Sequence, residues 1–84
     1  MKKIDNGIRQ MAGAKAVQNH VTEIDGVRGG MVFNMPKEDQ VDAITDTITD
    51  ILHYAELIGI KSHSDICRVA QQHMMDELEQ EGKE

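Results

Sequence analysis

Apolar residues recur at intervals of three and four along the segment that follows Pro36. The row runs from Val41 to Ile58 without an intervening glycine or proline. Such spacing places all its members on one side of an α-helix, as in the seam of a coiled coil. We therefore predict a helix after Pro36 whose apolar row turns inward. The row consists of Val41, Ile44, Ile48, Ile51, Ala55 and Ile58.

Residues with specific backbone preferences mark the ends of this helix. Pro36 suits the first turn, because its missing N–H has no helical partner there. Gly59 favours the left-handed conformation that ends a helix, and Ile60 can make the apolar contact behind it. Ser62 or Ser64 is a suitable start for a second helix. Since a linker of about four residues makes two helices antiparallel neighbours, we predict an αα-hairpin over residues 36–81.

The second predicted helix also has an apolar face. Ile66, Val69 and His73 recur on it at intervals of three and four, and we assign them to the core or to an oligomer interface. A histidine in such a stripe is usually a neutral core residue, but His73 could instead face a symmetry mate. Cys67 borders this face, and we expect a buried, unreactive thiol because no second cysteine or paired base accompanies it. Residues 82–84 should form a frayed tail.

The signals in residues 1–35 are weaker. Sparse apolar residues predict a short amphipathic helix within residues 1–20, although two glycines disfavour it. Residues 21–24 and 31–33 are strand-like and flank an Asp-Gly turn signal, so this stretch is either a β-hairpin or a mobile loop. The predicted fold class is mainly α, with residues 1–84 forming a single small domain.

The composition limits the core that such a chain can build. Its 84 residues include no Trp, one Tyr, one Phe and six Met, and the single cysteine allows no disulfide framework. Association is the remaining route to stability, so we expect a homo-oligomer. We also expect a cytoplasmic protein that binds no membrane, because the chain has one cysteine and no signal-peptide pattern after Met1.

The charge balance restricts the class of partner. Nine basic and fifteen acidic residues give a formal net charge of −6. A chain of this sign is repelled by phosphate backbones and anionic lipids, which disfavours direct binding of nucleic acid. A basic protein is the favoured partner, unless the charge serves only solubility.

Three aspartates follow one another at intervals of four on the first predicted C-terminal helix. Asp42, Asp46 and Asp50 lie on the side opposite the apolar row, and His53 lies on the same polar side. Like charges at this spacing destabilise a helix by a few tenths of a kcal/mol per pair. We interpret these four residues as a binding surface for a cationic partner. The alternative is a merely solvated face.

The two helices of the predicted hairpin carry histidines and carboxylates at similar distances from the turn between them. Asp50 and His53 on one helix oppose His73 and Asp76 on the other, and two such pairs could bind a divalent metal if they converged. A helical wheel turns His53 away from the apolar row but places His73 within the apolar face. We therefore expect no metal site and no cofactor.

No catalytic motif is recognisable in the sequence. Asp39 and Asp42, together with Asp76 and Glu79, distantly match the paired acids with which all-α nucleotide pyrophosphatases hold magnesium. A minimal metal-dependent nucleotide hydrolase is accordingly one alternative function. A transcriptional regulator or antitoxin is another, although the chain has no basic helix for DNA.

Residues 38–78 resemble small helical accessory proteins of unknown role found in bacteriophages and mobile elements. The resemblance implies an accessory protein that acts in a host cytoplasm, and it carries no functional residues over. Combined with the charge, it leads us to expect a non-enzymatic protein that binds, and inhibits or modulates, a host protein such as a nucleic-acid-handling defence complex. The matching stretches are Val41-Asp42-Ala43-Ile44-Thr45-Asp46, Ile51-Leu52-His53-Tyr54-Ala55, Asp65-Ile66 and Ala70-Gln71-Gln72-His73.

Overall fold

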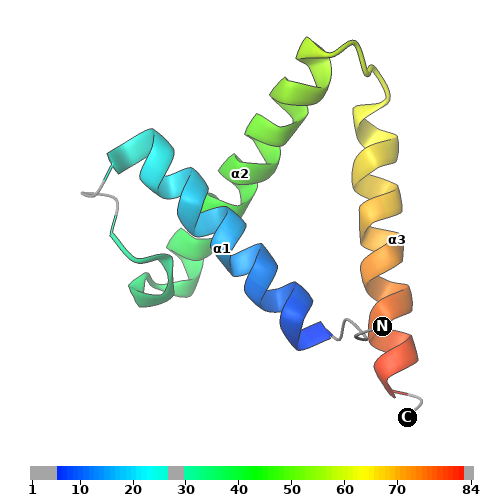
Figure 1. The fold of residues 1–84 in the computed structure, drawn as a ribbon, viewed down its shortest axis with the longest axis horizontal. Coiled ribbons are helices and arrows are strands. Elements are labelled where there is room, and N and C mark those ends of the chain that lie inside the picture. The colour runs from blue at the N-terminus through cyan, green and yellow to red at the C-terminus, as the bar shows by residue number, and fades with distance from the viewer. Residues whose placement is uncertain (1–5, 27–29, 83–84) are drawn as a thin grey trace.

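A computed structural model describes residues 6–26 and 30–82, and this part of the chain is almost entirely helical (Figure 1). It contains three α-helices, one short 3-10 helix and no strand. The predicted mainly α class is confirmed. The elements are α1 (Asn6–Asp25), η2 (Val32–Asn34), α2 (Lys37–Leu57) and α3 (His63–Gly82).

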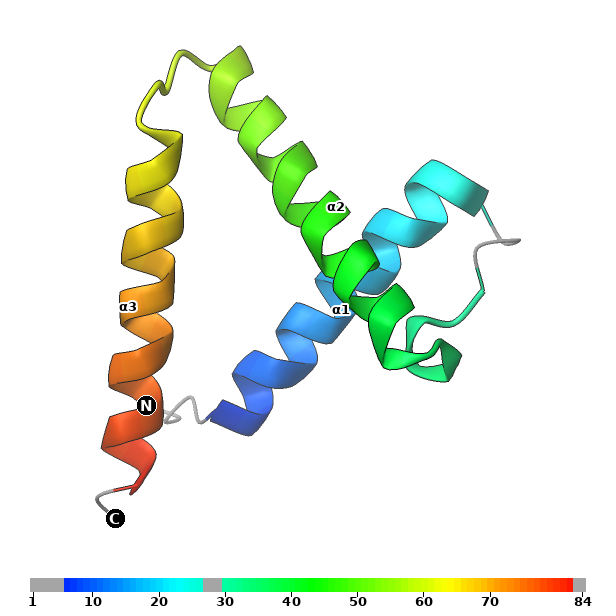
Figure 2. The same cartoon turned by 180° about the vertical axis from the view of Figure 1, so that it is seen from behind.

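The helices form an open arrangement rather than a closely packed bundle. Helix α1 crosses α2, and its N-terminal end reaches the C-terminal part of α3, while α2 and α3 diverge from the turn that joins them (Figures 1 and 2). The two predicted C-terminal helices are thus present, but the expected antiparallel packing between them is not found. The main packing partner of α2 is α1.

A small core lies where α1 crosses α2. Val21 of α1, Val32 of η2 and Ala43 of α2 are buried together, and Val17 and Met35 pack against them. The small side chain of Ala43 permits close approach of the two helices. No side chain in the described part of the chain is fully buried. The core is therefore thin, as the composition predicts.

The β-hairpin, one of the two alternatives for residues 21–35, is not found where the structure describes these residues. Residues 21–25 belong to α1, and residues 32–34 form η2. Val17 and Val21 lie one turn apart on the same face of α1, so helical continuation lets both reach the core. The rest of the predicted turn, residues 27–29, lies outside the described residues.

Gln18 fixes the connection between α1 and η2. Its Oε1 accepts a hydrogen bond of 2.7 Å from the Val32 backbone N–H, and its Nε2 donates one of 2.9 Å to the Gly30 carbonyl. A single side chain thereby satisfies two backbone groups of the returning segment. This contact holds Val32 over the core.

The predicted end of α2 is confirmed in detail. Gly59 has a φ of 89°, its N–H donates to the Glu56 carbonyl, and the Ile60 N–H donates to the Ala55 carbonyl. These two bonds constitute a Schellman motif. The second helix then begins at His63, directly after Ser62. The frayed tail predicted for residues 82–84 lies outside the described residues, except for Gly82 at the end of α3.

The prediction that the apolar row of α2 turns into the core of the chain is wrong. Only Ala55 is buried, because the adjacent strip that contains Ala43 and Thr47 packs on α1 instead. The expectations of a buried Cys67 and of a core position for His73 are also wrong, since both side chains are exposed. The other members of the row have exposed fractions of 45–55%: Val41, Ile44, Ile48, Ile51 and Ile58. On α3, Ile66 and Val69 are exposed to 36% and 38%.

A polar contact joins the N-terminal end of α1 to α3. The Asn6 side chain donates to the Glu77 carbonyl at 3.1 Å, and Arg9 Nε lies 2.6 Å from Glu77 Oε2. Glu77 thus connects α3 to the first turns of α1. None of the helices in residues 6–26 and 30–82 is long and apolar enough for a membrane span.

Candidate functional site

A groove of about 520 Å³ runs between α1 and α2 beside their crossing point. Its lining combines an apolar floor with many carboxylates. The floor includes Val21, Ile24 and Met35. Most of the carboxylates come from α2, and one comes from the C-terminal end of α1. They belong to Asp25, Asp39, Asp42, Asp46 and Asp50, and we call this feature the acidic groove.

Helical spacing explains why four of these carboxylates share one side of the acidic groove. Asp39, Asp42, Asp46 and Asp50 follow at intervals of three and four, which keeps them on one face of α2. Successive members that are four residues apart are separated by about 6 Å along the helix axis. The carboxylates therefore form a line along the groove.

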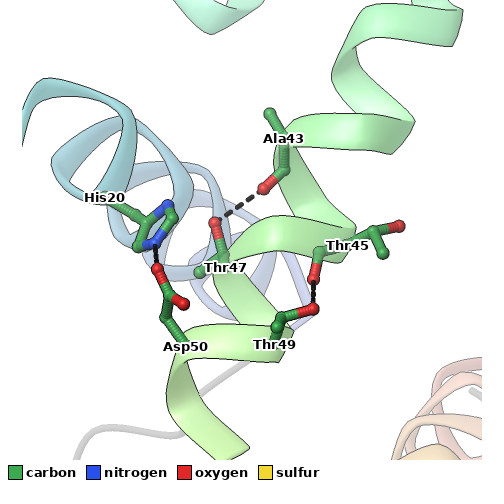
Figure 3. A network of polar contacts seen from close by, with 6 residues as sticks. All are labelled: His20, Ala43, Thr45, Thr47, Thr49 and Asp50. Atoms are coloured by element: carbon green, nitrogen blue, oxygen red, sulfur yellow. Dashed lines mark hydrogen bonds and ion pairs between the residues drawn. The ribbon is translucent and has the colours of Figure 1, made fainter. Parts of the chain in front are cut away.

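His20 is the basic side chain that meets this line. Its Nε2 donates to Asp50 Oδ2 at 2.6 Å, which ties the middle of α2 to α1 (Figure 3). The His20 side chain is 17% exposed and that of Asp50 is 45% exposed. Asp50 is thus already engaged within the chain.

The threonine hydroxyls of α2 donate hydrogen bonds to backbone carbonyls of the same helix. Thr47 is buried at the α1–α2 crossing, and its hydroxyl donates to the Ala43 carbonyl at 2.8 Å (Figure 3). Thr45 and Thr49 form the same kind of bond one turn back. Because these hydroxyls are satisfied within α2, they leave the carboxylates as the polar groups that the helix offers to a ligand.

The acidic groove contains no lysine or arginine among the residues that line it in the described part of the chain. His20 is the only basic residue in that lining, and it contacts Asp50 alone of the five aspartates. Asp42 and Asp46 are exposed. Uncompensated charge along a concave surface focuses the electrostatic potential and attracts cations.

The structure brings three of the four predicted partner-binding residues together. Asp42, Asp46 and Asp50 all line the acidic groove, whereas His53 is exposed and lies outside its lining. Sequence reasoning missed His20 and Asp25 on the opposite helix. The contact of His20 lies 30 residues further along the chain, so no local spacing signals it.

The acid pairs of the enzymatic alternative are not brought together. Asp39 and Asp42 line the acidic groove, but Asp76 belongs to α3, which diverges from α2 (Figure 2). Asp76 instead accepts a hydrogen bond of 2.9 Å from Gln72. Within residues 6–26 and 30–82, no group of three or more His, Cys, Asp or Glu side chains could hold a metal ion.

Comparisons with protein-family models, with curated proteins and with solved structures found no match. The resemblance of residues 38–78 to phage accessory proteins therefore stays a prediction. A small helical fold hosts many unrelated activities, so the function depends on the residues of the site.

Proposed function

We propose that this chain is a non-enzymatic interaction protein that binds a basic segment of another protein in the acidic groove. The observation that supports this function is the combination of five aspartates with an apolar floor and no lining lysine or arginine. The net charge of −6 adds long-range attraction for such a partner.

The two kinds of lining match the two parts of a lysine or arginine side chain. The aliphatic stem of such a residue packs on apolar surface, here Ile24 and Met35, while its charged head stays in a polar environment. Asp42 and Asp46 offer that environment. An arginine gains further from the planar fork with which it can bind one carboxylate through two parallel hydrogen bonds.

The aspartates have different roles in this proposal. Asp50 is held by His20, so its main contribution is to fix the distance between α1 and α2. Asp42 and Asp46 make no contact of this kind with the residues that the structure describes, and they are the principal ligands of the partner. His53, outside the groove lining, is not part of the proposed contact.

The proposed partner is a protein whose basic surface ordinarily binds nucleic-acid phosphates. Such surfaces carry lysine and arginine clusters, which the line of carboxylates on α2 would attract. Occupation by the acidic groove then excludes the nucleic acid, which makes the chain an inhibitor or modulator of that host protein. A phage-type accessory protein acting in a host cytoplasm fits this role.

The test measures binding of a fluorescent arginine-rich peptide to the intact chain by anisotropy. We expect the double variant Asp42→Asn, Asp46→Asn to bind about tenfold more weakly, equivalent to about 1.4 kcal/mol. The matched control is Glu23→Gln, Asp76→Asn, which changes the net charge equally but alters residues outside the groove lining. Far-UV circular dichroism should be the same for all three proteins.

The control decides between a defined site and diffuse attraction. If both double variants lose the same affinity, only the overall charge acts and the acidic groove is not the site. Binding of duplex DNA by the wild-type chain at low salt would equally contradict the proposed class of partner, because it would show that the negative charge does not exclude phosphates.

A further inference from the structure

The apolar row of α2 is uncovered over several turns. Ile44 and Ile48, near its middle, are each 45% exposed, and Ile51 is 54% exposed. On α3, a shallow hollow of about 430 Å³ is lined by Asp65, Ile66, Val69, Ala70 and His73. Contiguous apolar surface of this kind on a small chain marks an interaction site.

The exposed area of the whole chain points to the same conclusion. The chain exposes 7085 Å², whereas a compact monomer of 9.4 kDa is expected to expose about 5,000 Å². Its radius of gyration is 14.7 Å, against about 12 Å for a compact domain of 84 residues. The excess is about 2,000 Å² per chain, which falls within the range that obligate dimers bury per subunit.

The distribution of charge favours a second copy as the occupant. All members of the apolar row are uncharged, while the aspartates of α2 lie on another side of the helix, in the acidic groove. Two chains of charge −6 can therefore meet through the row without placing their aspartate lines opposite each other. A second copy is present whenever the chain is made, and association with it would stabilise a chain whose own core is thin.

We propose that two copies of this chain associate through the apolar row of α2 and the exposed apolar residues of α3. The interface is isologous, so each copy contributes the same surface. Ile44, Ile48 and Ile51 lie at its centre, and Ile66 and Val69 add to it from α3. The acidic groove stays open on each copy, which gives the dimer two equivalent grooves.

The experiment is sedimentation equilibrium on the full chain, combined with thermal unfolding at several protein concentrations. We expect a mass of twice 9.4 kDa for the wild type and a melting temperature that rises with concentration over an about 100-fold range, since dissociation accompanies unfolding. Ile48→Lys should convert the dimer to a monomer. The matched control Leu57→Lys alters a side chain that is 81% exposed and not part of the row, and it should remain dimeric.

The concentration dependence keeps the test informative even if Ile48→Lys does not fold. An unfolded Ile48→Lys, beside a dimeric wild type and a dimeric Leu57→Lys, supports the interface because it shows that folding requires this contact. A monomeric wild type with a constant melting temperature overturns the proposal, and so does a dimer that survives Ile48→Lys or an assembly larger than two copies. The peptide-binding test reads affinity and not oligomeric mass. A negative result in one experiment therefore leaves the other proposal intact.

Discussion

His20 of α1 donates a 2.6 Å hydrogen bond to Asp50 of α2, although the two residues are 30 positions apart in the chain. Both residues line the acidic groove. Their contact lies beside Thr47, which is buried where the helices cross (Figure 3). It is therefore a tie between the helices, and in the described part of the chain it engages the carboxylate at one end of the line on α2.

Replacing His20 with alanine should weaken the tie without unfolding the chain. Because Asp50 is half exposed, solvent screens the pair, and we expect the free energy of unfolding to fall by only about 0.5–1 kcal/mol. Urea denaturation at low salt measures this, and the difference should shrink in about 1 M NaCl. Asn19→Ala, at the exposed neighbouring position, is the control. Equal effects of the two substitutions would show that the contact adds no stability.

Substitutions at Val21 and Ile24 should distinguish the role of the core in stability from the role of the groove floor in peptide binding. Val21 is 6% exposed, so Val21→Ala should lower the free energy of unfolding by about 1–3 kcal/mol. Ile24 is 63% exposed, so Ile24→Ala should change it by less than about 0.5 kcal/mol while weakening peptide binding in the acidic groove. Urea denaturation and peptide anisotropy on both variants test this. A destabilised Ile24→Ala would place that residue in the core instead.

The sequence predicts the ends of α2 well because they depend on local backbone chemistry. Pro36 precedes its first residue, and Gly59 adopts the expected left-handed conformation after it. Periodicity does not say what covers an apolar row, however. Ala43 and Thr47 are unremarkable in sequence, yet they form the strip that packs on α1 and leave the isoleucines exposed.

Only the α2 side of the acidic groove could be predicted from the sequence. The spacing of Asp42, Asp46 and Asp50 places them on a common face, and this required only helical geometry. The opposite side depends on how α1 crosses α2, which is a tertiary contact. The strand-like composition of residues 21–24 also concealed the continuation of α1, because the burial of Val21 outweighs its local β-propensity.

Gln18 should be essential for the position of the segment around η2. Gln18→Ala removes the acceptor of the Val32 N–H and the donor to the Gly30 carbonyl, so we expect a loss of about 1–3 kcal/mol from the free energy of unfolding. Hydrogen exchange at the Val32 amide should also accelerate. Gln71→Ala on the exposed surface of α3 is the control and should have little effect. Unchanged protection of the Val32 amide would contradict this role for Gln18.

Gly59 and Gly13 should respond in opposite directions to the same substitution. An added Cβ meets nothing within 4 Å at either position, so steric clashes do not contribute. Gly59 has a φ of 89°, and an alanine there is strained by roughly 1–2 kcal/mol, which should lower the free energy of unfolding. Gly13 lies inside α1, where alanine should instead stabilise the helix by about 0.5–1 kcal/mol.

Urea denaturation of both glycine variants and the wild type measures these two effects. The slope of the free energy of unfolding against urea concentration should be the same in all three proteins. The decisive result is the sign of the change in the free energy of unfolding. A gain in helix propensity raises it, whereas strain from a left-handed backbone conformation lowers it. A stable Gly59→Ala would mean that the Schellman motif does not determine where α3 departs from α2. A destabilised Gly13→Ala would mean that another chain or segment packs against α1 at that glycine, since the single chain leaves open space there.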